Sequence, residues 1–103
     1  MTVDLSGIFD VTEIWAARKR ISGIVYRAPL VYSGSLSERT GSQVYLKMEC
    51  WQKTGSFKLR GALSKLSALT PDERERGVVT ASAGNHGLGV AYAGQVLGIA
   101  AIT

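Results

Sequence analysis

The sequence predicts an α/β fold with a parallel open sheet and flanking helices. Short apolar stretches at 77–81 and 99–103 are typical of buried strands, and a helical pattern lies between them. A strand-like stretch at 44–48 is also followed by a helical pattern. Strands that alternate with helices are joined by right-handed crossovers and form parallel sheets. The 103 residues, 46% hydrophobic and 19% charged, suffice for one small soluble domain.

The first predicted helix begins near residue 10. Residues 1–9 have no periodic pattern and are expected to form a loose arm. Asp10 is a suitable N-cap, with Glu13 at the third helical position, and an apolar stripe follows up to Ile21. Gly23, directly after Ser22, is expected to end this helix.

The middle of the chain is predicted to be a loop followed by a strand. Serine and glycine dominate 33–42, which favours a loop, and 44–48 is expected to be the strand. Cys50 continues the apolar run, so we expect a buried, inert thiol. A single cysteine excludes an internal disulfide and fits a reducing compartment.

Two further helix starts follow. Ser56 is a suitable N-cap for a helix whose apolar stripe continues to Leu69. Thr70 then precedes a proline and is followed by Glu73, which predicts a capping box and a short helix that Gly77 stops.

The last predicted helix ends near Leu97 and precedes the final strand. It carries a stripe of small residues that would let it lie close to a sheet. The members of the stripe are Gly87, Ala91, Gly94 and Gly98.

Composition excludes several classes of function. The net charge is +4, but the basic residues are scattered and form no ribbon with aromatic residues, so we expect no nucleic-acid partner. The N-terminus has no signal-peptide pattern, and the most apolar segment, 88–102, is too short to span a membrane. We therefore expect a cytoplasmic protein that does not bind membranes.

Lys58 is the first candidate for chemistry. It lies in the first turn of the helix that begins at Ser56, where the positive end of the helix dipole makes a lysine charge unfavourable. Gly61 and Ala62, one turn on, leave room beside the amine, and Phe57 offers a flat apolar surface. Such a lysine could be a nucleophile that holds a planar cofactor, although a solvated lysine at a helix start is the simpler interpretation.

The second candidate is the stretch 82–89, between a strand and a helix. In open α/β sheets ligands bind there, and free backbone N–H groups favour a phosphate or a carboxylate. The glycine spacing is the reverse of the dinucleotide fingerprint, so a Rossmann site is not indicated. Asn85 tolerates a left-handed backbone and can donate through its amide. His86 is interpreted as a helix-capping residue rather than a general base.

These two stretches together resemble the fold-type II pyridoxal-phosphate enzymes, in particular the threonine/serine dehydratase (threonine deaminase) family. That family carries Gln-x-Thr-Gly-Ser-Phe-Lys-x-Arg-Gly-Ala, matched from Gln52 to Ala62. It also carries Ser-Ala-Gly-Asn-His-x-x-Gly-x-Ala, matched from Ser82 to Ala91. The resemblance implies the fold of the tryptophan synthase β-like enzymes and pyridoxal 5'-phosphate as cofactor.

The resemblance also implies roles for individual residues. Lys58 would form a Schiff base with pyridoxal phosphate and later take the Cα proton of an amino-acid substrate. Phe57 would lie against the cofactor ring, and Asn85 would donate to its 3′-oxygen. The substrate carboxylate would bind mainly to backbone amides of Ser82, Ala83, Gly84, Asn85 and His86. No metal is implied.

The implied reaction is the β-elimination of L-threonine or L-serine to a 2-oxo acid and ammonia, consistent with a place in isoleucine biosynthesis. Serine racemase and threonine synthase, which share the fold, are alternatives, as is a truncated α/β binding module without catalysis. Racemases of this fold carry a second serine where this chain has Ala83, which favours dehydration.

Family members also have a glycine-rich loop for the cofactor phosphate and a later Ser or Cys that faces the pyridine nitrogen. Neither has a counterpart up to Thr103. We therefore expect 1–103 to be the N-terminal portion of a catalytic domain whose remainder is absent. About 1–50 would belong to a large domain and about 51–103 would start a small one. The chain alone is expected to be inactive, and the full-length protein to be a homo-oligomer.

Overall fold

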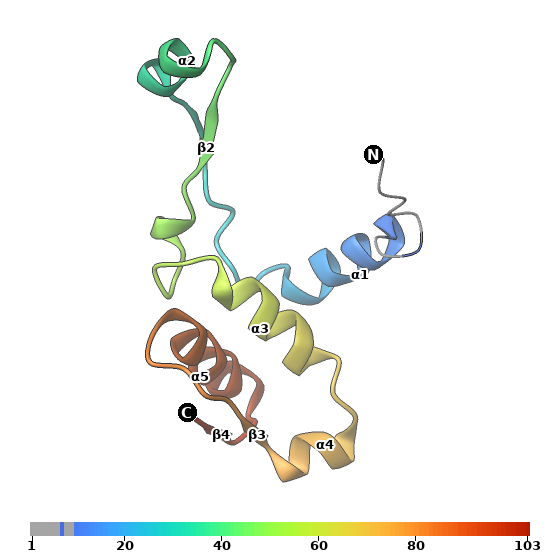
Figure 1. Ribbon diagram of the computed structural model, residues 1–103. Helices are drawn as coiled ribbons and strands as arrows, with labels where there is room; N and C mark the ends of the chain where they lie inside the picture. The colour runs from blue at the N-terminus through green and yellow to red at the C-terminus, as the bar shows by residue number, and fades with distance from the viewer. Residues whose placement is uncertain (1–6, 8–9) are drawn as a thin grey trace.

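The computed structural model describes residue 7 and residues 10–103. Its helices are α1 (Val11–Ile21), α2 (Gly34–Thr40), α3 (Lys58–Ser67), α4 (Pro71–Arg76) and α5 (Asn85–Leu97), with a 3-10 turn, η1, at Glu49–Trp51. Strands β1 (Leu30–Tyr32) and β2 (Tyr45–Lys47) pair antiparallel, and β3 (Val78–Val79) and β4 (Ala101–Ile102) pair parallel. Figure 1 shows α3 between α1 and α5, while the β1–β2 hairpin carries α2 away from them.

The predicted helix boundaries at Asp10, Thr70 and Gly77 are confirmed. A carboxylate oxygen of Asp10 accepts from the N–H of Thr12 at 2.8 Å. Thr70 and Glu73 form the reciprocal capping box, and Gly77 stops α4 with a φ of +75°. The arm predicted for residues 1–9 lies outside the described residues, except for Gly7.

Two predictions about local structure are wrong. Residues 33–42 are not a loop, because Ser33 caps α2 through its hydroxyl and Gly41 ends it with a φ of +68°. Ser56 is not the N-cap of α3. Phe57 takes that position, although the Ser56 hydroxyl still accepts from the N–H of Lys58 at 3.4 Å.

The sheet differs in part from the prediction. The parallel pair joined by a helix is present as β3, α5 and β4. The strand predicted at 44–48 forms β2, but it pairs antiparallel with β1, with Val31 opposite Leu46. Cys50 is exposed rather than buried, because the chain turns into η1 after β2 and the strand pattern ends there.

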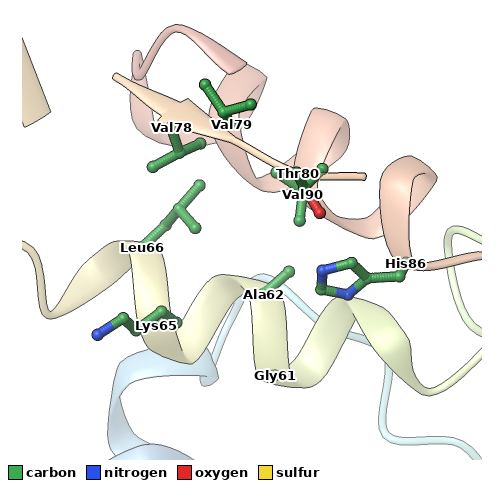
Figure 2. Close-up of a pocket in the computed structure, with 9 residues that line it drawn as sticks. All are labelled: Gly61, Ala62, Lys65, Leu66, Val78, Val79, Thr80, His86 and Val90. Atoms are coloured by element: carbon green, nitrogen blue, oxygen red, sulfur yellow. The ribbon is translucent and has the colours of Figure 1, made fainter. Parts of the chain in front are cut away.

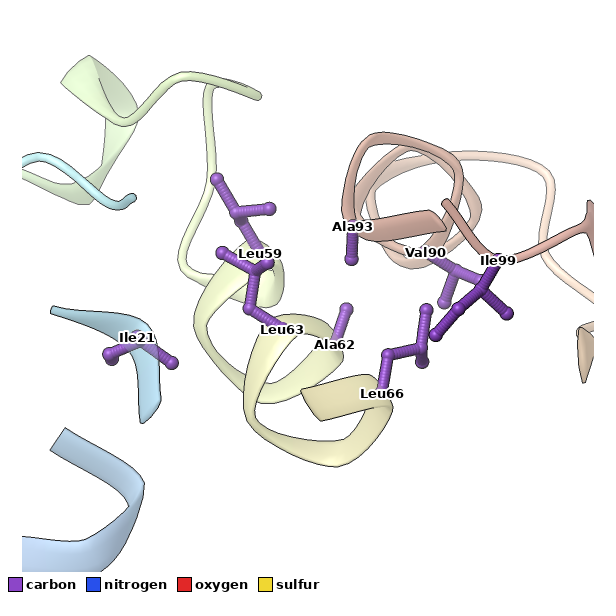
Figure 3. Packing of buried hydrophobic residues seen from close by; sticks show 8 residues of the cluster. All are labelled: Ile21, Leu59, Ala62, Leu63, Leu66, Val90, Ala93 and Ile99. Atoms are coloured by element: carbon purple, nitrogen blue, oxygen red, sulfur yellow. The ribbon is translucent and has the colours of Figure 1, made fainter. Parts of the chain in front are cut away.

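The core is built around α3, as Figure 3 shows. Leu59 and Leu63 have no exposed surface, and they lie between Ile21 of α1 and the apolar face of α5. The buried cluster is completed by Ala62, Leu66, Val90, Ala93 and Ile99. Burial of an aliphatic side chain contributes roughly 1.5–3 kcal/mol to stability. Because the buried side chains of α3 contact both α1 and α5, α3 holds these two helices together.

Half of the predicted small-residue stripe packs as expected. A Cβ at Gly94 would lie 2.7 Å from the carbonyl oxygen of Ile99, and one at Gly87 would lie 2.6 Å from the Thr103 methyl group. Ala91 and Gly98 are exposed. In the part of the chain that is described, no helix is long and apolar enough to cross a membrane.

Candidate active site

Lys58 is the first residue of α3, and its side chain is exposed. Its Nζ lies 5.2 Å from the centroid of the Phe57 ring, which is itself 60% exposed. At Gly61, one turn along the helix, an added Cβ would meet nothing within 4 Å. The amine therefore has an aromatic surface on one side and open space beside the next turn.

The second stretch turns from β3 into α5, with Gly84 as N-cap. The N–H of Gly84 donates to the Ser82 hydroxyl at 3.2 Å, which tightens the turn. Among the described residues, the backbone N–H groups of Asn85, His86 and Gly87 have no hydrogen-bond partner. They lie at the positive end of a helix and can bind an anion together. Asn85 is helical, so the left-handed backbone that it could tolerate is not used.

Gly89 brings the two stretches together. A Cβ at this position would lie 3.2 Å from the Leu59 nitrogen, 3.2 Å from the Lys58 carbonyl carbon and 3.3 Å from the Lys58 carbonyl oxygen. The first turn of α5 thus rests directly on the backbone of Lys58. Only glycine permits so close an approach without moving one of the two helices.

A hollow of about 260 Å³ lies beside this contact, between α3 and β3. Figure 2 shows the His86 imidazole above the turn of α3 that contains Gly61 and Ala62. Most of the lining is aliphatic, and the polar groups at its edge belong to Lys65, Thr80 and His86. Lys58 does not line the hollow, so the two motifs meet there through Gly61, Ala62, His86 and Val90 only.

An ion pair between η1 and the first turn of α3, formed by Glu49 and Arg60, was not predicted from the sequence. Arg60 donates to both carboxylate oxygens of Glu49, through Nη2 at 2.7 Å and Nε at 3.0 Å. The hydrogen bonds from Arg60 are the main cause that lowers the pKa of Glu49, and Gln52 contributes in the same direction. Glu49 and Arg60 are eleven positions apart, and this spacing gives no periodic signal that would have identified the pair.

The comparisons with known proteins show the family to which the chain belongs. The family model described as "Pyridoxal-phosphate dependent enzyme" matches residues 21–103. The L-threonine ammonia-lyase of Thermotoga maritima is 55% identical over 94 residues, which are 91% of this chain and 23% of that protein. The catabolic L-threonine dehydratase of Escherichia coli K12 is 44% identical over 96% of this chain and 30% of its own length.

Solved structures are similar as well. Maize serine racemase superposes with a TM-score of 0.81 at 41% identity, over 89% of this chain and 29% of that one. The processed form of threonine deaminase isoform 2 from Solanum lycopersicum superposes with a TM-score of 0.71 at 41% identity. The match covers 90% of this chain and 27% of that one. The chain belongs to the pyridoxal-phosphate dependent enzymes, which confirms the family, the fold class and the cofactor that the motifs predicted. It spans about a quarter of the length of the Thermotoga relative.

The close contact at Gly89 generates the first prediction. We expect Gly89→Ala to have a free energy of unfolding roughly 1–3 kcal/mol below that of Gly61→Ala, because both substitutions gain helix propensity but the methyl group at residue 89 must displace helix backbone 3.2–3.3 Å away. Urea denaturation measures the change. Gly61→Ala is the control, since its methyl group enters open space in a helix and should raise stability by about 0.5–1 kcal/mol. Equal stability of Gly89→Ala and Gly61→Ala would contradict the prediction, because it would show that the two helices accommodate the methyl group without strain.

The lowered pKa of Glu49 generates the second prediction. A carboxyl group whose pKa is lowered by folding stabilises the fold above its ordinary value of 4.5, and this contribution is lost as the pH falls below it. We expect stability to fall less steeply below pH 4.5 in Glu49→Gln than in the unmodified chain, as measured by urea denaturation across pH. Asp10 and Glu73 also have lowered pKa values, but they act equally in both proteins. Identical pH profiles would contradict the prediction.

Proposed function

We propose that this chain supplies the cofactor lysine and the carboxylate-binding loop of a pyridoxal-phosphate dependent dehydratase for L-threonine or L-serine. The observation that carries the proposal is the contact at Gly89, which brings the uncapped start of α5 against the backbone of Lys58. A lysine whose backbone packs against the free start of a helix suits a cofactor with an aldehyde and a substrate with a carboxylate. The similarity to a threonine ammonia-lyase and a threonine dehydratase supports the same reaction.

The residues present fit the cofactor. Lys58 offers an exposed primary amine next to the flat Phe57 ring, and the missing side chain of Gly61 leaves space beside it. Asn85 is exposed at the start of α5, where its amide can donate to a ring oxygen. When bound, pyridoxal phosphate supplies an electron sink that stabilises negative charge at the Cα of an amino acid.

We assign a separate role to each group of residues in the candidate site. Lys58 would hold the cofactor and, once displaced by the substrate, take the Cα proton. The N–H groups at the start of α5 would orient the carboxylate so that the Cα–H bond faces this amine. Elimination of water from Cα and Cβ, followed by hydrolysis, converts threonine to 2-oxobutyrate and ammonia with no net change in water. Ala83 offers no hydroxyl for a second proton transfer, which favours elimination over racemisation.

A racemase is the second candidate, because the rice serine racemase is 44% identical over 89% of this chain and maize serine racemase shares its fold. A binding module without catalysis is the third, and it would be favoured if Lys58→Ala had no measurable effect. The cytoplasmic location, the homo-oligomeric full-length protein, the inactivity of the chain alone and the division near residue 50 stay predictions.

The first test of the proposal is reductive labelling. We expect pyridoxal phosphate and borohydride to modify Lys58 in preference to the other lysines, because its exposed amine lies over the Phe57 ring and its backbone packs against α5. Peptide mass mapping reads the distribution. Lys53→Ala is the matched control, since Lys53 also lies over an aromatic ring, 5.1 Å from the centroid of Tyr26. Even labelling of all lysines would contradict a preformed site in this chain.

The second test is a chimera. The 94 matched residues of the Thermotoga L-threonine ammonia-lyase are replaced by those of this chain, and 2-oxobutyrate is measured with threonine as substrate. We expect activity that Lys58→Ala lowers by ~10²-fold or more, as for loss of a general base, and that Lys53→Ala retains. With L-serine, D-serine in place of pyruvate would favour the racemase. Activity without Lys58 would overturn the proposed role.

A further inference from the structure

Two side chains, Gln52 and Arg60, lie on either side of the segment that carries Lys58 and bond to the same two partners. Gln52 Nε2 and Arg60 Nη2 donate to the Tyr26 carbonyl oxygen at 2.9 and 3.2 Å. They also donate to the Glu49 carboxylate, Gln52 at 3.4 Å and Arg60 at 2.7 and 3.0 Å. We call Tyr26, Glu49, Gln52 and Arg60 the Arg60 network.

The Gln52 side chain is fully engaged in this network. It is only 4% exposed, and its Oε1 accepts from the N–H groups of Tyr26 at 2.9 Å and Lys53 at 3.1 Å. Together with the two bonds that Nε2 donates, these use the whole hydrogen-bonding capacity of the amide. A buried amide satisfied in this way has one orientation, so the start of the lysine segment is fixed.

Arg60 fixes the other end of the segment. Its planar guanidinium reaches the Glu49 carboxylate through two nitrogens and the Tyr26 carbonyl through one of them. A lysine at this position would present a single point charge and could not reproduce the fork. Arg60 lies in the first turn of α3, two residues beyond Lys58, so its bonds determine where that turn begins.

The backbone between these two ends is held by few bonds of its own. Gly55 N–H donates to the Gln52 carbonyl at 2.8 Å, while Lys58 N–H reaches only the Ser56 hydroxyl at 3.4 Å. The N-cap of α3, Phe57, makes no side-chain hydrogen bond to the helix, so the long bond to Ser56 is the one side-chain bond that the backbone of its first turn receives among the described residues. A helix start without a cap frays readily, so the side chains of the Arg60 network must supply the order that the backbone lacks.

We propose that Arg60 is a positioning residue for Lys58, acting through Glu49 and the Tyr26 carbonyl while Gln52 fixes the opposite end of the segment. The role of Lys58 itself rests on the proposed function. The Arg60 network holds residues 53–59 in one conformation and thereby presents the amine beside the anion site. Its own side chains take no part in proton transfer.

The test compares Arg60→Met, which keeps an apolar stem and loses all three bonds, with Arg60→Lys in the full 103-residue chain. The control is Arg20→Met, because Arg20 also bonds to α3, at Ser64 Oγ over 3.2 and 3.3 Å, but away from Lys58. Amide hydrogen exchange of residues 53–59 is measured without cofactor. The share of borohydride-fixed pyridoxal phosphate found on Lys58 is measured separately. Glu49→Gln replaces Arg60→Met if circular dichroism shows that the latter does not fold.

In Arg60→Met, we expect exchange of the hydrogen-bonded amides in 53–59, those of Lys53, Gly55 and Lys58, to rise about tenfold, the effect of losing a charged hydrogen bond. The Lys58 share of the label should fall to that of the other lysines. Arg60→Lys should retain more of this share, and Arg20→Met should change neither readout. Unchanged exchange overturns the proposal even if the proposed function fails, since that measurement needs no cofactor. Faster exchange with an unchanged Lys58 share overturns it as well, because the segment would then be ordered without positioning the amine.

Discussion

The arrangement of this chain depends on the approach of α5 to the backbone of α3 at Gly89. Any larger side chain there would meet helix backbone, so the packing of the two helices is set by one missing Cβ. The same approach closes the core, since Val90 and Ala93 follow on α5 and belong to the same buried cluster as Leu59 and Leu63 on α3. The packing of α5 on α3 therefore has two effects. It buries the leucines of α3, and it places the first turns of α5 against the backbone of Lys58.

Much of this structure was predictable because its determinants are local. Asp10 and the pair Thr70–Glu73 cap their helices through hydrogen bonds that span two or three residues, so their spacing in the sequence reveals them. The apolar positions of α3 repeat with the helical period, which predicted its buried face correctly. The glycine-rich turn before α5 marked the start of that helix on the same local grounds, and the anion site there stays a prediction.

Most of the wrong and missing predictions concern interactions between distant residues, whereas the helix cap misplaced at Ser56 is a local error of one residue. The partner of β2 is β1, which precedes it by a short helix, and no pattern within either strand specifies antiparallel pairing. Ser37 illustrates the difficulty at α2: its buried hydroxyl accepts from the N–H of Val44 and donates to the Ser33 carbonyl, so a serine that favours a loop by composition stabilises a helix by contact. The bonds from Gln52 and Arg60 to Tyr26 cross 26 and 34 residues and are invisible to any periodicity.

The N-termini of the helices are of two kinds, those capped by a side chain and those without such a cap. Of the helices that the structure describes, those without a cap are the two that carry the candidate site. Side chains cap α1, α2 and α4, through Asp10, Ser33 and Thr70, and these helices take no part in the candidate site. Within the described residues, α3 and α5 have no side-chain cap, and they carry Lys58 and the anion loop. A cap on α5 would occupy the amides to which we propose that the substrate carboxylate binds, and one on α3 would place another polar side chain near the amine. The missing caps lower the stability of the first turns of α3 and α5. The buried leucines of α3 and the hydrogen bonds of the Arg60 network compensate for this loss.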